Sequence, residues 1–568
     1  MTGAQGIEVV EDPREEVYAT SSGQVLFEEY LFYAALQRQE EEKEAIEEGR
    51  TRNRILQPLG KKNLGNDAQV DEKRQSVVEK EEAPSSPTSE GEHQIPPMTP
   101  EQIEHANAAR ALRLASWASI FYLITTDILG PFNAPFAISQ VGWAPGVILY
   151  FFMGAIALYT GLILWRLFCR LDSLRYPLKT YSDIAERIFG RVARHICTVL
   201  QTIQLVINVG TICLSNGQAL SQMSRGRLCF SVCIVIWAIL GMIIGQIRTL
   251  KGYGWLANSA VWINLSIIFI SMGFVAHSPP NFESAKKSLG VDPGPVVTKA
   301  IGDLPLFLRV NGIMNMVFAY GGSMIFPEMM AEMRRPLDFW KGLALAQMLI
   351  FSAYLLYGAF IYAFQGQFTL PLAYQGVSKF SWQTVGNALS LVTGIIAAGL
   401  YGNIGIKVIY INIVEGWFNG PRIMSRKGHF LWSGMVLLYW AIAFIIGSAI
   451  PQVQTITGLI AAIAIMQFTY SLPLLLIFGY QVITDAMSED QAYYPGRGTS
   501  GRVDTWRQWS RWRRGLFGGK WYYKVINLGM SLGGLAMACL GMWGAGKSIK
   551  NTFEMAGAAT SFGCGAPV

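Results

Sequence analysis

Three ionisable side chains stand in stretches of this sequence that are otherwise apolar. Asp127 lies in TDILGPFNAPFAISQ, Glu328 in IFPEMMAEM and Lys407 in GNIGIKVIY. A carboxylate or an ammonium group is costly to bury among apolar side chains, so it is retained there mainly where it binds, pairs with or moves a charge. The chemistry that these residues could perform is therefore proton transfer or ion pairing, with Lys407 as a candidate partner of Asp127.

The stretch around Asp127 also carries residues that interrupt a helix. Pro131 and Pro135 lack a backbone amide, so they leave the carbonyl groups of Asp127 and Pro131 without helical partners. Gly130 adds backbone freedom at the same level. Because an unpaired backbone group in hydrocarbon costs several kcal/mol, such a break is expected only beside a cavity or a bound polar ligand. A simple proline kink is the alternative for a single segment.

A second apolar stretch is interrupted in the same way. It reads VFAYGGSMIFPEMMAEM, with a Gly-Gly-Ser sequence in its middle, and Gly322 precedes Pro327 by five positions, as Gly130 precedes Pro135. Paired Gly/Pro interruptions in corresponding helices of opposite direction predict two inverted repeats with a binding site at the breaks.

Both stretches belong to a chain that is much more apolar than a soluble domain. Hydrophobic residues make up 51% of the sequence and charged residues 15%, against roughly 25% charged residues in soluble proteins. Eleven apolar segments follow Arg113, each near the roughly 20 residues that span a bilayer. The sequence thus predicts an all-α polytopic membrane protein. We expect its helices at 115–139, 143–168, 192–219, 228–247, 253–276, 307–333, 337–364, 384–415, 429–449, 452–480 and 522–546.

Basic residues predict the orientation of these segments. The loops that follow even-numbered segments are rich in lysine and arginine, whereas the loops that follow odd-numbered segments contain few. Cytoplasmic loops carry such an excess, so we expect the N-terminus and the basic loops in the cytoplasm. Eleven crossings then place the C-terminus outside the cell.

The chain divides into a polar tail, a membrane domain and a C-terminal tail. Residues 1–108 form the polar tail, and the Lys-, Glu-, Ser- and Pro-rich composition of 60–104 predicts a largely disordered chain there. Residues 27–50 could form an amphipathic helix within this tail. The membrane domain covers residues 109–548, and residues 549–568 form the second tail.

The sequence argues against several other classes of function. Its seven cysteines include no CxxC pair and no neighbouring histidine, so we expect them to be packing residues and expect neither a metal site nor a cofactor. No nucleophile–base pair or phosphate loop occurs in the apolar segments, so we do not expect an enzyme. The net charge of +7 comes with bases in short loops, which indicates membrane orientation rather than nucleic-acid binding.

The interrupted segments and their surroundings resemble the amino acid/auxin permease family, within the amino acid–polyamine–cation superfamily. The resemblance covers about residues 110–545, and the long charged N-terminus and basic loop are similar to fungal neutral amino acid permeases. It implies a LeuT-type fold in which 115–276 and 307–480 are two five-helix halves and 522–546 is one extra helix. Where the family usually has another glycine, this chain has Ile128. The stretches that carry the resemblance are GPFNAPFAISQVGW (130–143), TYSDIAERIFG (180–190), IGQIRTLKGYGWLAN (244–258) and FAYGGSMIFPEMMAEMRRP (318–336).

The resemblance implies secondary active transport of an amino acid by alternating access. Half-helix N-terminal ends favour a carboxylate and C-terminal ends favour an ammonium group, and a zwitterionic amino acid presents both. Asn208 and Thr211 on helix three, Asn403 on helix eight and Phe318 are weaker candidate site residues. We expect the substrate to contact Ile128, Leu129, Gly130, Phe132, Asn133, Ala319, Tyr320, Gly321, Gly322 and Ser323.

The driving ion is expected to be a proton rather than sodium. Sodium-coupled members of this fold hold the cation partly with hydroxyl groups of helix eight, but GNIGIKVIY contains none, and the charge of Lys407 could replace the ion. The proton carrier could be Asp127, Lys407 or Glu328, whereas Glu332 could pair with nearby arginines.

Uptake of neutral amino acids across the plasma membrane is the leading hypothesis for the function. A vacuolar or cationic amino acid carrier is one alternative, since Asp127 could bind a basic side chain. A sensor that binds an amino acid and signals through its tail is another. The partners expected are an amino acid, a proton and the lipid bilayer, and the sequence gives no oligomeric state.

Overall fold

The structure is a computed structural model in which helices carry almost all of the regular structure. It describes residues 25–56, 103, 113–247, 253–418, 420–421, 423, 425–450, 452–496, 498–554 and 561–566. Apart from residue 103, the segment 60–104, for which disorder is predicted, lies outside these ranges. Within them, β-pairing is limited to two isolated bridges.

Every one of the eleven predicted segments is helical. Among the described residues, eight helices are long and apolar enough to cross a membrane. The other three segments are α9 (Phe230–Ile244), which is shorter, and the two interrupted segments. The predicted all-α polytopic membrane protein is therefore confirmed. The uninterrupted helices are α6 (Trp143–Leu171), α8 (Arg191–Met223), α10 (Tyr253–Ala276), α14 (Phe339–Gln365), α15 (Phe380–Ile409) continued by η7 (Tyr410–Glu415), α16 (Arg426–Ala449), α17 (Val453–Ile460) continued by η8 (Ala461–Ser471) and α18 (Leu472–Ala486), and α20 (Trp521–Glu554).

Both interrupted segments break where their glycines and prolines stand. The first consists of α4 (Trp117–Ile128), a 3₁₀ turn η1 (Pro131–Asn133) and α5 (Ala134–Val141). The second consists of α12 (Leu306–Ala319), a 3₁₀ turn η3 (Ser323–Ile325) and α13 (Phe326–Ala331).

The halves of the two broken helices meet crosswise. Helix α5 packs against α12. At the other end of the bundle, the Ala115 amide donates to the Glu332 carbonyl at 2.9 Å, and the Arg334 amide donates to the Ala115 carbonyl at 3.0 Å. The foot of α4 is thus joined to the end of α13, and the breaks lie between these two contacts.

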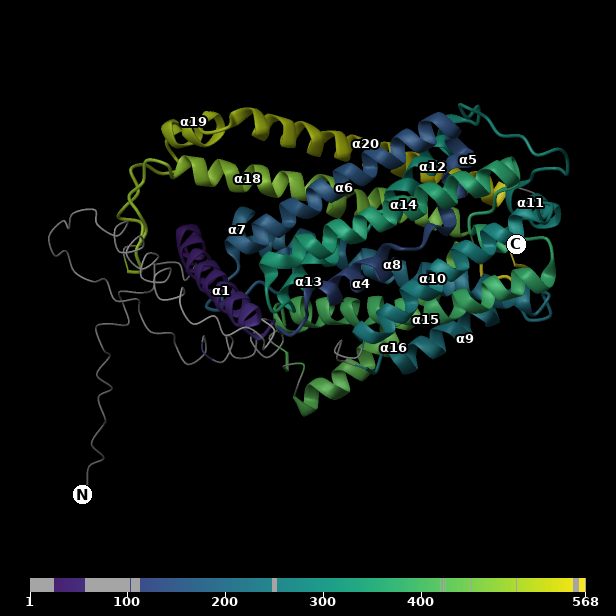
Figure 1. Cartoon of the computed structure of the whole chain (residues 1–568), viewed down its shortest axis with the longest axis horizontal. Helices are drawn as coiled ribbons and strands as arrows, with labels where there is room; N and C mark the ends of the chain where they lie inside the picture. Colours follow the sequence, from purple (N-terminus) through teal and green to yellow (C-terminus); the bar gives the residue numbers. More distant parts are fainter. Residues whose placement is uncertain are drawn as a thin grey trace, which may run out of the picture.

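Additional helices distinguish the two ends of the bundle (Figure 1). One end, called here the α1 end, carries α1 (Phe27–Leu56), α7 (Tyr181–Phe189) and α19 (Trp509–Phe517). The opposite end, called the α11 end, carries α11 (Phe282–Leu289) and the C-terminal residues.

A disulfide between Cys229 and Cys564 joins the start of α9 to the C-terminal residues. The expectation that all cysteines are packing residues is therefore wrong for this pair. The sequence hid the pair because 335 positions separate the two residues. Helix α20 also runs to Glu554, beyond the predicted end at residue 546, and the Phe562 amide donates to the Ser448 carbonyl at 3.1 Å.

Helix α1 docks on the loop between α6 and α7. Arg38 donates to the Asp172 carboxylate at 3.0 Å, and Arg113, at the foot of α4, binds the same carboxylate at 2.8 Å. Asp172 is completely buried beneath them. The Tyr176 hydroxyl adds a hydrogen bond of 2.6 Å to Glu29. The helix predicted for 27–50 thus forms, and it fastens the foot of α4 to this loop.

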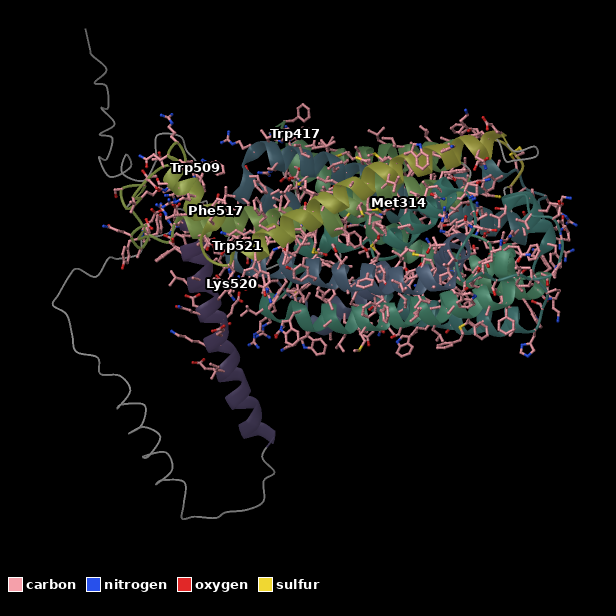
Figure 2. All side chains as sticks on the ribbon, turned by 90° about the horizontal axis from the view of Figure 1, so that it is seen from above. Met314, Trp417, Trp509, Phe517, Lys520 and Trp521 are labelled. Atoms are coloured by element: carbon pink, nitrogen blue, oxygen red, sulfur yellow. A yellow bond between two sulfur atoms is a disulfide. The ribbon has the colours of Figure 1, made fainter. Side chains whose placement is uncertain are left out.

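Exposed aromatic side chains gather where α19 meets α20. Trp509, Phe517 and Trp521 are exposed and lie at the α1 end (Figure 2). Tryptophan is enriched at membrane–water interfaces because its ring is amphipathic. Their position is therefore suited to the boundary between the apolar bundle and the solvent.

Candidate functional site

The break in the first helix leaves backbone carbonyl groups that side chains of neighbouring helices bind. The Tyr354 hydroxyl of α14 donates to the Ile128 carbonyl at 2.7 Å. The side-chain amide of Asn264, on α10, donates to the Leu129 carbonyl at 2.9 Å. These two carbonyl groups therefore have polar partners, as buried backbone requires. They belong to Ile128 and Leu129, whereas the sequence predicts unpaired carbonyl groups at Asp127 and Pro131.

A cavity of about 220 Å³, called here the central cavity, lies between the two breaks. Both unwound stretches contribute to its wall, together with α8, α10, α15 and the α17–η8 helix. None of the described side chains that line it is charged. Its polar lining comes mainly from Thr126, Asn133, Asn208, Thr211, Ser215, Asn216, Asn264, Ser390, Thr393 and Thr457.

Two amide oxygens in this wall have no hydrogen-bond partner among the residues that the structure describes. They are the side-chain oxygens of Asn208 and Asn264, both buried. A buried acceptor without a partner loses the hydrogen bonds that it would make to water. The two oxygens can therefore accept hydrogen bonds from a bound solute that carries N–H groups.

Six of the ten residues expected to contact a substrate line the central cavity. They are Ile128, Leu129, Gly130, Phe132, Asn133 and Gly321.

The other four, Ala319, Tyr320, Gly322 and Ser323, are not among its lining residues. The Tyr320 side chain instead lies against α6, where its hydroxyl donates to the Tyr150 carbonyl at 3.1 Å.

The weaker candidates divide in the same way. Asn208, Thr211 and Phe318 line the central cavity. Asn403 does not, and its amide donates to the Ile247 carbonyl at the end of α9 at 2.6 Å.

Sequence reasoning missed the part of α15 that faces the central cavity. Ser390, Thr393, Ala397 and Tyr401 line it, whereas the candidates predicted on this helix, Asn403 and Lys407, do not. These four residues are spaced by three or four positions and share one helix face. Polar residues at this spacing in an apolar helix were the available signal.

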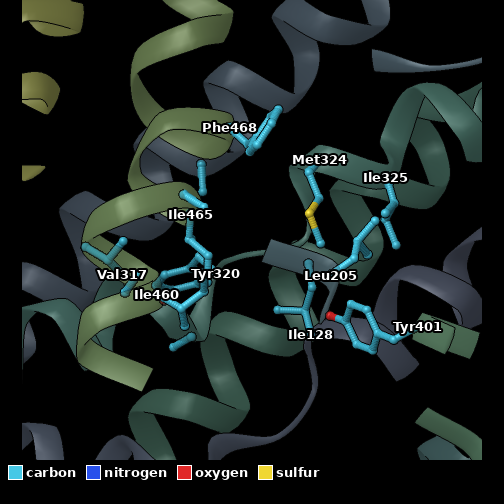
Figure 3. Close-up of a cluster of buried hydrophobic side chains, with 14 of the residues drawn as sticks. Ile128, Leu205, Val317, Tyr320, Met324, Ile325, Tyr401, Ile460, Ile465 and Phe468 are labelled. Carbon is cyan, nitrogen blue, oxygen red and sulfur yellow. The ribbon is translucent and has the colours of Figure 1, made fainter. Parts of the chain in front are cut away.

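An apolar layer closes the central cavity toward the α1 end. About one helical turn beyond the cavity, Leu205 on α8, Met324 on η3 and Phe468 on η8 are fully buried. They belong to the same hydrophobic cluster as Ile465 and Tyr401, which line the cavity (Figure 3).

Glu328 lies behind this apolar layer and does not line the central cavity. One of its carboxylate oxygens accepts hydrogen bonds from the Gln201 amide at 2.8 Å and the Tyr181 backbone amide at 3.2 Å. Its other oxygen is buried and has no hydrogen-bond partner in the described part of the chain. Gln201 also donates to the Met324 carbonyl at 3.0 Å. Glu328 is thus tied to α7, α8 and η3 by neutral groups.

Lys407 is largely buried on α15 and interacts electrostatically with Glu332, at the end of α13. Glu332 thus has a lysine within electrostatic range, where the sequence suggested arginines. Asp127 is the last residue but one of α4, and its side chain lies outside the described part of the structure. The expected pairing of Asp127 with Lys407 stays a prediction.

Comparisons with known proteins agree on one class. A family model described as "Transmembrane amino acid transporter protein" matches residues 113–493. The chain is 24% identical over 385 residues to the "N amino acid transport system protein" of Neurospora crassa, covering 66% of this chain and 78% of that protein. It is 24% identical over 380 residues to a "Transmembrane transporter" of Fusarium pseudograminearum, covering 64% and 75%. It is 22% identical over 288 residues to "Lysine histidine transporter-like 4" of Arabidopsis thaliana, covering 46% and 59%.

Proposed function

Because the chain belongs to the transmembrane amino acid transporter family, we propose that it is a secondary active transporter that takes up neutral amino acids together with protons. Transport proceeds by alternating access to the central cavity. The crosswise contacts of α5 with α12 and of the foot of α4 with the end of α13 support a LeuT-type arrangement of two inverted halves.

The observation that carries this proposal is the position of the central cavity at both helix breaks. Its volume of about 220 Å³ lies below the roughly 300–1,000 Å³ of sites for drug-sized ligands, so it suits a small solute. The free oxygens of Asn208 and Asn264 can accept hydrogen bonds from an α-ammonium group. Helix α5 begins beside the cavity, and a helix N-terminus favours a carboxylate.

Amino acids with neutral side chains suit such a cavity best. A buried charge needs a partner of opposite charge, and no described lining residue supplies one. The ring of Phe132, which packs against Tyr357 and Tyr374, offers an apolar wall instead. The carboxylate of Asp127 keeps a cationic amino acid as the alternative.

A proton suits the described site better than sodium does. A hard cation needs several oxygen ligands, and the carbonyl groups of Ile128 and Leu129 already accept hydrogen bonds from Tyr354 and Asn264. The unpartnered oxygen of Glu328 can take up a proton, because protonation removes the charge from a buried group. Asp127 and Lys407 are the other two coupling candidates.

The orientation that fits this function places the α1 end in the cytoplasm. The disulfide between Cys229 and Cys564 lies at the opposite end, and disulfides persist mainly in oxidising compartments. This supports an extracellular α11 end in the plasma membrane. The lumen of the vacuole is the alternative.

Uptake into sealed vesicles that contain the purified full-length protein tests the proposal. We expect a radiolabelled neutral amino acid to accumulate when the pH outside is lower than the pH inside, and a proton ionophore to abolish the accumulation. A sodium gradient at equal pH should drive none. A competition panel of unlabelled amino acids then identifies the substrate class.

Three other outcomes would contradict parts of the proposal. Accumulation that needs sodium and ignores the pH gradient would overturn proton coupling. Competition by lysine or arginine alone would favour the cationic carrier. Binding of an amino acid without any flux would favour a sensor.

A further inference from the structure

A second cavity, called here the outer cavity, lies at the α11 end and has a volume of about 400 Å³. Its wall is formed by α5, the start of α12, the segment 297–304, the residues before α17 and the end of α20. The segment 297–304 is held in place by backbone hydrogen bonds, among them the Trp143 amide to the Lys299 carbonyl at 3.0 Å. The outer cavity therefore has a fixed frame.

Several amide side chains line the outer cavity. Asn311, Gln452 and Gln454 are all buried and all line it. The Gln452 side-chain oxygen accepts from Gln454 at 2.7 Å and from Thr552 at 3.1 Å. The side-chain oxygen of Asn311 has no hydrogen-bond partner among the described residues. It lies against Gly458 on α17, so close that a Cβ there would overlap it. The polar wall of the outer cavity therefore comes from the side chains of Gln452 and Gln454 rather than from a free acceptor.

Two opposite charges also line the outer cavity. Lys299 and Asp303 form an exposed ion pair there, with side chains 48% and 68% exposed. An exposed pair contributes little stability, so it can exchange its internal contact for a ligand that carries both charges. A zwitterionic amino acid is such a ligand.

Asn315, which is completely buried, lines neither cavity but makes hydrogen bonds to residues that line each of them. Its side-chain oxygen accepts a hydrogen bond from the Thr457 hydroxyl at 2.7 Å and from the Asn133 amide at 3.5 Å. Both of these donors line the central cavity.

The side-chain amide of Asn315 faces the other way. It donates to the Asn311 carbonyl at 2.8 Å and to the Gln454 carbonyl at 3.3 Å, and both of these residues line the outer cavity. One amide side chain thus bridges groups from both cavities, and it joins α12 to α17 and to the break before α5.

We propose that the outer cavity is a second binding site for a zwitterionic amino acid and that Asn315 is the gate between this site and the central cavity. The inference rests on the proposed transport function. Neutral hydrogen bonds are exchanged for bonds to water or to a polar solute at little net cost. The Asn315 network can therefore part and reform as the solute passes.

Labelling of a reporter cysteine in the central cavity tests the gate. The reporter is Ser215→Cys, in a background where the exposed Cys539 is replaced by serine. A small, membrane-impermeant methanethiosulfonate reagent is added at the α11 end of sealed vesicles that contain the full-length protein. We expect Asn315→Ala to raise the labelling rate about tenfold or more over the reporter alone. Thr457→Val, which removes one hydroxyl and keeps the shape, should raise it less.

Asn527→Ala is the matched control, because Asn527 is an equally buried asparagine that accepts a hydrogen bond from Tyr159 on the far side of the bundle. Its labelling rate should equal that of the reporter alone. An unchanged rate in both Asn315→Ala and Thr457→Val, when the unsubstituted protein takes up amino acid, would overturn the gate and leave the transport proposal intact. If Asn315→Ala is labelled faster but the unsubstituted protein shows no uptake, the transport proposal is overturned and the gate is not, because labelling needs no substrate.

Protection tests the second site. A reporter Ser288→Cys lines the outer cavity, and we expect millimolar neutral amino acid to slow its labelling. Replacing Lys299 with alanine should reduce this protection, because it removes the cation available for the carboxylate. If the protein transports an amino acid but that amino acid does not slow the labelling of Ser288→Cys, the second site is overturned.

Discussion

The central cavity is closed in two different ways at its two ends. Toward the α11 end, one network of neutral hydrogen bonds around Asn315 separates it from the outer cavity. Toward the α1 end, Leu205, Met324 and Phe468 form an apolar layer, and Glu328 lies behind it. A polar layer can open by exchanging partners, whereas an apolar layer must separate packed surfaces and expose them to water. The difference suggests that the α1 end is the slower side to open.

The largest expected effect concerns the apolar layer. Phe468→Ala removes a fully buried ring, which should cost about 3–5 kcal/mol of stability and lower the midpoint of thermal unfolding of the purified protein. The matched control is Phe430→Ala, because Phe430 is 84% exposed. Equal midpoints for the two variants would contradict the closure at the α1 end.

The second expected effect concerns the acid behind this layer. Glu328→Gln keeps the shape and a hydrogen-bond acceptor but cannot exchange a proton. We expect accumulation driven by a pH gradient to fall about tenfold or more, while exchange of labelled for unlabelled amino acid continues. Vesicle uptake with and without the gradient measures both, and Glu332→Gln is the control on the same segment.

Two further variants separate the remaining coupling candidates. If Glu328 carries the proton, Asp127→Asn should leave the pH dependence of uptake unchanged. Lys407→Ala should abolish accumulation if the lysine replaces a cation. If Asp127→Asn loses the pH dependence of uptake while Glu328→Gln keeps it, then Asp127 and not Glu328 is the residue that carries the proton.

A smaller effect is expected where α1 fastens the foot of α4. Arg38→Ala removes one of the two arginines that bind the buried Asp172. Removing one partner of a buried ion pair is destabilising, so we expect α1 to be cleaved several-fold faster by a protease. Glu42→Gln, on the exposed side of the same helix, is the control and should be cleaved at the native rate.

The smallest effect concerns Glu41, which contacts Arg38 at 2.7 Å. Burial raises the pKa of Glu41, although Arg38 lowers it. Since the pKa is higher in the docked state, docking is favoured at low pH, and this contribution is lost as the pH rises through the raised pKa. Glu41→Gln should therefore not speed cleavage of α1 at neutral pH. Faster cleavage would mean that the ion pair outweighs the cost of burial.

The helices and both breaks could be predicted from the sequence because apolar length, glycine and proline act locally. The spacing of Gly130 and Pro135, repeated by Gly322 and Pro327, predicts two broken helices, and residues at both breaks line the central cavity. The orientation of side chains at the breaks could not be predicted in the same way. Tyr320 turns toward Tyr150 because an unwound chain has no fixed helical face.

Contacts between residues far apart in the chain also could not be predicted from the sequence. The gate depends on Asn315 and Thr457, which are 142 positions apart. Each is an unremarkable polar residue in its own helix. The disulfide between Cys229 and Cys564 joins residues that are farther apart still. Which distant residues meet is determined by how the helices pack against one another. The sequence around each residue contains no signal of that packing.

The central claim, that an amino acid binds between the two helix breaks, is tested most directly by equilibrium binding to the purified protein. Asn208 offers a free acceptor in the central cavity, so Asn208→Ala should weaken the binding of a neutral amino acid about tenfold or more. Asn527→Ala should bind as the native protein does. Equal affinity of all three proteins would contradict the account.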